Sequence, residues 1–394
     1  MIFAPAQADS IGKTICDMIA IKSLSGHESA MAAFVEAQLK DAGLKPVRDE
    51  EDNVWAVIEP QQAGAAATNT LHLSGHTDTV VPVEGWKSDP WTPEIGGSGD
   101  DRKIVGLGAS DMKSGLGVML HLARHFSQDA NRPKRLRLVL SFTVCEESPA
   151  NGKRNGVHRV LAREPGRWAI TTEASCDALC PTLALGCQGH AVAKITLQGR
   201  SAHSASPDKG VNAILAAAKI CARVDQLNKS FRDISVLGDV HAHAAAAVTL
   251  IKGGSAANII PEQCELTISR RVAPGESTTD VERELAAMTR DLDGVNATWT
   301  LRCDAPACVV DTHGPLLRAA SEASQALYRQ ARYSWNRART DMVLFRQAGM
   351  DVLNIGPGFS GQAHVSGEYV RLIDLPRSAN LIAETMVRLD RFLG

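Results

Sequence analysis

The chain has 394 residues, of which 44% are hydrophobic and 22% are charged, and its formal net charge is −2. This composition is that of an ordinary globular protein, and the length suffices for two domains. The near-neutral charge balance offers no basic surface of the kind that nucleic-acid-binding proteins use, so we expect no nucleic acid among its partners. No apolar stretch approaches the roughly 20 residues that a membrane span requires, so we expect no membrane partner either.

The cysteines and the first residues bear on the cellular compartment. The nine cysteines are an odd number without a Cys-x-x-Cys pair, which indicates reduced thiols and not a disulfide framework. The start of the chain lacks the positive charge and the long apolar core of a secretory signal peptide. We therefore expect a cytoplasmic protein.

Helical and strand patterns alternate through the first part of the chain, which is typical of an α/β fold. Apolar residues recur at helical spacing over 11–21 and 28–42, and a third helix is predicted over 113–126. That third helix begins just after Asp111, so its positive end would point toward an anionic cluster there. Short apolar runs predict buried strands, and these lie at 53–58, 70–73, 136–144 and 168–171.

The pattern changes from Gly189 onward. Helices are predicted over 211–227 and 278–292. Strands are predicted around them, at 191–197, 246–252, 264–272 and 297–301. The resulting order β-α-β-β-α-β is that of a ferredoxin-like α+β domain.

The first pattern resumes after about Ala305, with a predicted helix over 316–328 and a predicted strand over 352–355. One domain is therefore expected to be inserted within another. We place the inserted domain at 189–305 and the two parts of the outer domain at 1–188 and 306–394.

A series of histidines and carboxylates runs through the outer domain, and most of its members follow predicted strands. In open α/β sheets, ligands gather outside the carboxyl ends of the strands. Imidazole and carboxylate groups without cysteine are the ligands of a hydrolytic zinc centre that keeps one position open for water. The series predicts a two-metal amidohydrolase. In chain order it consists of His76, Asp78, Asp111, Glu146, Glu147, Glu173 and His364.

Spacing within the series divides the roles. His76 and Asp78 are two residues apart, so on an extended strand they share a face, where the Asp78 carboxylate can accept from one imidazole nitrogen while the other binds metal. Glu146 and Glu147 are adjacent, so a strand or its continuation sends them to opposite sides. One of the two can then be a ligand, and the other is free to act as a base.

Several short motifs, in the same order along nearly the whole chain, resemble the di-zinc family of acetylornithine deacetylases, succinyl-diaminopimelate desuccinylases, aminoacylases and glutamate carboxypeptidases. The motifs are Ser74-Gly-His76-Thr-Asp78-Thr-Val, Gly106-Leu-Gly-Ala-Ser-Asp111-Met-Lys-Ser-Gly115, Glu146-Glu147, Gly199-Arg-Ser-Ala-His203-Ser, Asn258-Ile-Ile-Pro261 and Gln362-Ala-His364.

The resemblance implies a role for each member of the series. Asp111 would bridge two metal ions, with His76 and Glu173 completing one site and Glu147 and His364 the other. Glu146 would be the general base that takes a proton from the attacking water and later returns it to the leaving amine. One departure from the family pattern is that Ala174, and not proline, follows Glu173.

The resemblance also implies an architecture. The outer domain would be a catalytic domain with a mixed central sheet flanked by helices, and the inserted ferredoxin-like domain would act as a lid and form a homodimer. His203 would reach into the partner's active site, where a donor can stabilise the oxyanion that forms as water adds to the amide. The alternative for His203 is a loop histidine bonded to neighbouring serines.

Substrate binding is expected from the inserted domain. A substrate carboxylate needs a partner, and the fork of an arginine binds both carboxylate oxygens at once. Arg270 and Arg271 are adjacent on a predicted strand and point in opposite directions, so one faces the site. Motif position favours Arg271, together with Asn258, and an exposed Arg270 would then be solvated.

The expected activity is the metal-dependent cleavage of an N-acyl amino acid, as in a deacetylase or desuccinylase of amino-acid biosynthesis. The alternative is a carboxypeptidase or dipeptidase that acts on short peptides with a free carboxyl end, and a non-catalytic binding module is a further alternative. The expected cofactor is a pair of divalent ions, with Zn²⁺ favoured and Co²⁺ or Mn²⁺ compatible with the same ligands. The acyl group and the native metal stay open.

Overall fold

A computed structural model describes residues 2–62 and 69–393. The chain divides into two compact units, and each is described by itself. The first unit comprises Met1–Gly186, Val310–Asn336 and Thr340–Gly394. The second unit comprises Cys187–Val309 and Arg337–Arg339.

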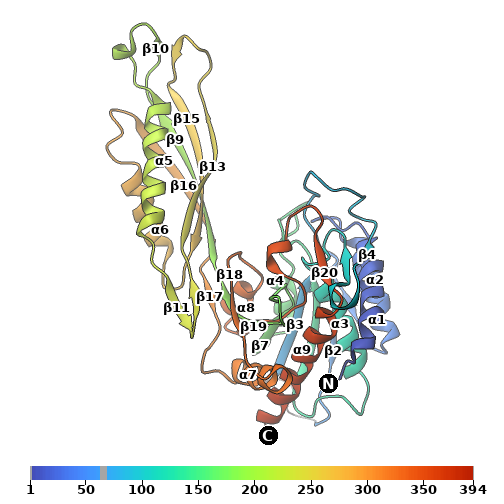
Figure 1. The fold of residues 1–394 in the computed structure, drawn as a ribbon. Coiled ribbons are helices and arrows are strands. Elements are labelled where there is room, and N and C mark those ends of the chain that lie inside the picture. The colour runs from blue at the N-terminus through green and yellow to red at the C-terminus, as the bar shows by residue number, and fades with distance from the viewer. Residues whose placement is uncertain (1, 63–68, 394) are drawn as a thin grey trace. The chain divides into compact units, whose positions relative to one another are not determined.

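The first unit is built around a mixed sheet, in which the strand order runs β1-β2-β6-β3-β7-β19-β8 (Figure 1). The four central strands β6, β3, β7 and β19 are parallel to one another, and β2 and β8 flank them in the antiparallel direction. The strands are β1 (Val47–Arg48), β2 (Val54–Ile58), β3 (Thr70–His76), β6 (Arg137–Thr143), β7 (Trp168–Thr171), β8 (Leu183–Cys187), β18 (Tyr333–Asn336) and β19 (Asp351–Asn354).

Helices cover both faces of this sheet. Helix α3 packs against β3 and β6, with α1 and α9 packed on α3, whereas α4 packs on β6 and α8 packs on β7 and β19. Gly115 lets α3 approach the end of β7, because a Cβ atom there would lie 2.2 Å from the Thr172 carbonyl oxygen. The helices are α1 (Ala8–Ile19), α2 (Ser29–Asp41), α3 (Lys113–Phe126), α4 (Val157–Arg163), α7 (Pro315–Tyr328), α8 (Met342–Gln347) and α9 (Asp374–Phe392).

The predicted elements of this unit are present within a few residues of their expected bounds. The prediction of a mixed sheet flanked by helices is confirmed for the described residues. Sequence analysis missed α4, α8 and the 19-residue α9, together with a small sheet of order β20-β5-β4. The strands of that sheet are β4 (Glu94–Gly96), β5 (Lys103–Val105) and β20 (Tyr369–Arg371).

The second unit holds an antiparallel sheet of order β13-β15-β9-β16, with α5 and α6 packed on it (Figure 1). A core of small and aliphatic side chains fills the space between the sheet and the helices, including Ile195, Ile220 and Leu266. The elements in chain order are β9 (Gly189–Gln198), β10 (Ala202–His203), α5 (Ala213–Ser230), β11 (Ile234–Leu237), β12 (Val240–Ala242), β13 (Ala245–Gly253), β14 (Ile259–Ile260), β15 (Gln263–Val272), α6 (Thr278–Met288), β16 (Asn296–Ala305) and β17 (Cys308–Val309).

The expectation that Arg270 is solvated is wrong. Arg270 is 2% exposed on the helix-covered face of β15, and Arg271 points to the opposite face. The Arg270 guanidinium forms ion pairs with Glu276 at 2.7 Å and Glu284 at 2.9 Å, and it lies over the ring of Phe231. A buried charge is tolerated when it is paired and hydrogen-bonded in this way.

The nine cysteines all lie among the described residues, and no two of them are joined by a disulfide there. Within the described residues, no helix is both long and apolar enough to cross a bilayer.

Candidate metal centre

The candidate site is formed at the carboxyl ends of the parallel strands of the first unit. His76 is the last residue of β3, and Glu146 and Glu147 follow β6 after a short bend. Glu173 comes two residues after the end of β7. Because β6, β3 and β7 are parallel neighbours, these side chains meet at one edge of the sheet, where ligands of such sheets gather.

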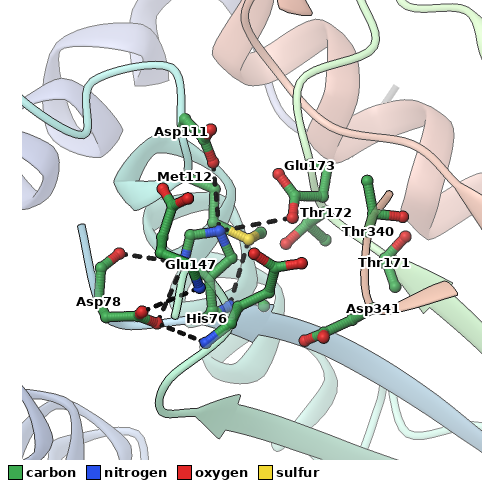
Figure 2. Close-up of polar contacts among 12 residues, drawn as sticks. His76, Asp78, Asp111, Met112, Glu147, Thr171, Thr172, Glu173, Thr340 and Asp341 are labelled. Carbon is green, nitrogen blue, oxygen red and sulfur yellow. Dashed lines mark hydrogen bonds and ion pairs between the residues drawn. The ribbon is translucent and has the colours of Figure 1, made fainter. Parts of the chain in front are cut away.

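His76 lies at the centre of the cluster, and it is buried. Figure 2 shows its ring in contact with Asp111 and Glu173: Nε2 lies 3.2 Å from Asp111 Oδ1 and 3.4 Å from Glu173 Oε1. On the other side of the ring, Nδ1 lies 3.0 Å from the Asp78 carbonyl oxygen and 3.4 Å from the Asp78 carboxylate. One imidazole nitrogen therefore faces the carboxylates of the site, and the other is held by Asp78.

The two oxygens of Asp111 face two different histidines. Oδ1 lies toward His76, whereas Oδ2 lies 3.6 Å from His364 Nε2. His364 Nε2 is also 2.9 Å from Glu147 Oε2. Asp111 thus stands between a His76–Glu173 pair and a His364–Glu147 pair.

The donor set fits a metal ion. Ligand atoms of His76, Asp111 and Glu147 all lie within 4.8 Å of one another. The Glu147 Oε1 atom is buried and makes no hydrogen bond to any described residue. A buried carboxylate oxygen without a partner is costly, and a cation among these groups would remove that cost.

The pKa shifts show how strongly negative charge is crowded here. Burial and the Asp111 carboxylate raise the pKa of Glu173 to about 7, and the same two causes raise the pKa of Glu147. The hydrogen bond to Glu147 outweighs burial and raises the pKa of His364 to about 9. For His76, burial opposes protonation, but the surrounding carboxylates raise its pKa well above the usual value. Divalent cations supply the positive charge that this arrangement lacks.

The environment of Glu146 disfavours the charged form of its carboxyl group. Burial and then the charge of Asp341 raise its pKa well above the usual value. Asp341 stands at the start of α8, is buried, and accepts a hydrogen bond from Asn155. A carboxyl group with a raised pKa is suited to proton transfer near neutral pH.

Asp78 does more than orient His76. Its Oδ1 and Oδ2 accept the backbone N–H groups of Glu146 and Glu147, each at 3.1 Å. Ser25 donates its hydroxyl to the same carboxylate at 2.7 Å. The sequence predicted only the contact with the imidazole, where the closer acceptor is the Asp78 carbonyl, so the main work of this carboxylate is to hold the Glu146-Glu147 bend.

Glu28 supports the same bend and was missed by the sequence analysis. It is fully buried, and its Oε1 accepts the backbone N–H groups of Gly26 at 2.8 Å and Cys145 at 3.2 Å. Cys145 has a positive φ of 57°, which a non-glycine residue keeps only where its surroundings enforce it. No sequence pattern marks Glu28, because its partner lies 117 residues further along the chain.

His203, Asn258 and Arg271 all belong to the second unit. His203 pairs with Ile259 across the β10–β14 ladder, and Ser204 donates its N–H to the Asn258 carbonyl at 3.0 Å. His203 Nδ1 accepts the N–H of Ala205, so one part of the local alternative for this histidine, a bond within its own loop, is present. His203 and Asn258 are thus neighbours, and Arg271 lies apart from them on the sheet.

The chain is similar to known proteins along most of its length. Residues 72–388 match the peptidase family M20/M25/M40. The chain is 30% identical to a succinyl-diaminopimelate desuccinylase of Stenotrophomonas maltophilia, covering 95% of this chain and 97% of that protein. It is 27% identical to an acetylornithine deacetylase of Myxococcus xanthus, covering 95% and 96% of the two chains.

Solved structures show the same fold. The aminopeptidase PepT of Bacillus cereus superimposes with a TM-score of 0.78 at 17% identity, covering 97% of this chain and 98% of that one. The YXEP protein of Bacillus subtilis, a dinuclear metal binding peptidase from the M20 family, gives a TM-score of 0.75 at 16% identity and covers 98% of each chain. The chain therefore belongs to peptidase family M20/M25/M40 and is a hydrolase that acts on amide bonds.

Proposed function

We propose that the protein is a metal-dependent amidohydrolase that removes the acyl group from N-acyl amino acids. The observation that carries the proposal is the position of Asp111, whose two oxygens face two imidazoles that each have a second carboxylate beside them. Relatives that are a desuccinylase and a deacetylase support this substrate class.

His76 and Glu173 would hold one divalent ion and His364 and Glu147 the other, with Asp111 as the shared ligand. Zinc suits imidazole and carboxylate donors, and Co²⁺ or Mn²⁺ can take the same ligands. When bound, the ions would polarise the scissile carbonyl and lower the pKa of a water to about 7.

Glu146 would carry the proton. Its carboxylate takes a proton from the attacking water and later gives it to the leaving amine, so one residue serves as base and then as acid. The backbone hydrogen bond from Glu146 to Asp78 supports this role, because it fixes the bend that carries the Glu146 side chain.

The first experiment compares a panel of substrates: N-acetylornithine, N-succinyl-diaminopimelate, N-acetylmethionine and a Gly-X dipeptide. Chelator-stripped protein should be inactive, and added Zn²⁺ should restore turnover of an N-acyl amino acid, as measured by release of the free amine. Turnover of the dipeptide alone would favour the peptidase alternative, which has support from the fold shared with a metallo-carboxypeptidase of Sulfolobus solfataricus. Stoichiometric zinc without turnover of any panel member would contradict the proposal and favour a binding module.

Two adjacent glutamates give a matched pair of variants. Glu146→Gln should keep both metals and lose about 10²- to 10⁴-fold in kcat, since it removes only the base. Glu147→Gln should lower metal content, since it removes a ligand. Metal analysis and initial rates on the same preparations separate the two effects. Equal metal loss in both variants would remove Glu146 from the role of base.

Arg271 and Asn258 of the second unit would each bind the substrate, Arg271 through the substrate carboxylate and Asn258 at a separate point, because the two residues lie apart. Arg271 supports this because, unlike Arg270, it is not committed to the ion pairs on the helix-covered face of the sheet. Arg271→Ala and Asn258→Ala should each raise KM by about tenfold or more, since a charge-assisted hydrogen bond contributes about 1.5–3 kcal/mol. Steady-state kinetics with the preferred panel member measures this change. An unchanged KM would exclude the residue.

We also propose that the second unit is an inserted lid and dimerisation domain. Strand β13 forms an edge of its sheet, and Leu250 and Ile251 on that strand are 67% and 56% exposed. Leu215 on the adjacent helix α5 is 63% exposed. An exposed apolar edge strand is a template for pairing with a second copy of the chain.

In such a homodimer, His203 would donate to the oxyanion in the partner's active site. His203→Ala and Glu146→Gln protein should each be nearly inactive, but a mixture that has exchanged subunits should regain about a quarter of wild-type activity. Half of its dimers are then mixed, and each mixed dimer has one complete site. Light scattering verifies the dimer. A mixture of exchanged dimers that stays inactive would show that His203 does not act across the interface.

A further inference from the structure

Glu368 is a buried carboxylate that neither the sequence analysis nor the proposed mechanism uses. It is 1% exposed and lies at the junction between the His364 loop and β20. Its backbone carbonyl accepts the N–H of Gly106 at 3.0 Å, which extends the pairing of β20 with β5. These backbone bonds alone therefore attach Glu368 to the loop that carries Asp111.

The Glu368 side chain turns into that loop and accepts three backbone N–H groups. Oε1 accepts from Ser110 at 2.7 Å and from Asp111 at 2.8 Å, and Oε2 accepts from Gly108 at 2.9 Å. A carboxylate that accepts several backbone donors is held in one orientation, and it holds the donors in turn. The loop segment 108–111 is thus folded around the Glu368 carboxylate.

The conformation of segment 108–111 depends on these three hydrogen bonds to Glu368. Gly108 has a positive φ of 80°, and a Cβ atom there would lie 2.8 Å from Thr79 Cγ2. The last of the three donors is the N–H of Asp111 itself. Loss of these hydrogen bonds would free the backbone that sets the direction of the Asp111 carboxylate.

The same anchor acts on His364. Only residues 365–367 separate His364 from Glu368. His364 has a positive φ of 60°, although its side chain is 51% exposed. A strained backbone at an exposed histidine persists only where neighbouring structure enforces it, and Glu368 is the nearest buried attachment point after it in the chain.

We propose that Glu368 is a positioning residue that fixes Asp111 and His364 relative to each other and so sets the spacing of the two metal sites. The inference rests on the proposed metal centre, because it assigns a role in building that centre and none in the chemistry.

Glu368→Gln is the direct test. A glutamine keeps one acceptor oxygen but brings an NH₂ donor against the N–H of Gly108, or against those of Ser110 and Asp111. Loss of a group that orients metal ligands typically costs about 10- to 100-fold in metal affinity. We expect a loss in that range, measured by calorimetric titration of the metal-free protein with Zn²⁺. We also expect an altered visible absorption spectrum of the Co²⁺-loaded protein.

Asp390 provides a matched control. It is 8% exposed, its Oδ1 accepts the N–H groups of Arg135 and Leu136, and its Oδ2 accepts the N–H of Lys134. As for Glu368, one carboxylate oxygen accepts two N–H groups and the other accepts one. These donors lie at the amino end of β6, which is the end opposite to the site. Asp390→Asn should lower the melting temperature of the metal-free protein about as much as Glu368→Gln does. It should leave Zn²⁺ affinity and the Co²⁺ spectrum unchanged.

The outcomes are distinguishable. Wild-type affinity and spectrum in Glu368→Gln, or an equal affinity loss in Asp390→Asn, would overturn this inference and leave the proposed function in place. Wild-type protein that binds no metal would overturn both. Should Glu368→Gln fail to fold, Glu368→Asp takes its place, because it keeps both oxygens on a side chain one methylene shorter and cannot reach all three donors. An unchanged Zn²⁺ affinity of that variant would equally overturn the inference.

Discussion

Mutual repulsion among buried carboxylates is the constraint on which the candidate site depends. Asp111, Glu146, Glu147 and Glu173 meet at one sheet edge, and burial and their own charges raise the pKa of all three glutamates. The same carboxylates raise the pKa values of the two histidines within reach of them, against the opposing effect of burial. Such a cluster persists only if the backbone holds it in place and if positive charge compensates it.

A second group of carboxylates holds the backbone in place. Asp78 and Glu28 accept the N–H groups of the residues from Cys145 to Glu147, and Glu368 accepts those of the Asp111 loop. Their oxygens accept hydrogen bonds from backbone donors, whereas oxygens of Asp111, Glu147 and Glu173 lie near the imidazoles of His76 and His364. The candidate site therefore contains two sets of carboxylates. One set lies beside the histidines, and the other set fixes the backbone around them.

The difference between these two sets explains why the sequence predicts the first set and not all of the second. Most of the candidate ligands follow strand ends and fall into short motifs with a characteristic spacing, so His76, Asp111 and the Glu146-Glu147 pair can be found from the chain alone. Glu28 and Glu368 contact residues 117 and at least 257 positions away, and nothing near them in sequence marks the contact. Arg270 was misjudged for a related reason, since its glutamate partners come from the following turn and helix.

The sequence by itself determined the α/β character, most of the central strands and the residue types of the candidate site, because apolar periodicity and strand-end position are local properties. It also predicted the alternation that separates Arg270 from Arg271. Only the tertiary structure decided which face of the sheet each arginine takes, that each Asp111 oxygen faces a different histidine, and that buried carboxylates anchor the ligand loops. These depend on contacts between segments far apart in the chain, which local patterns do not encode.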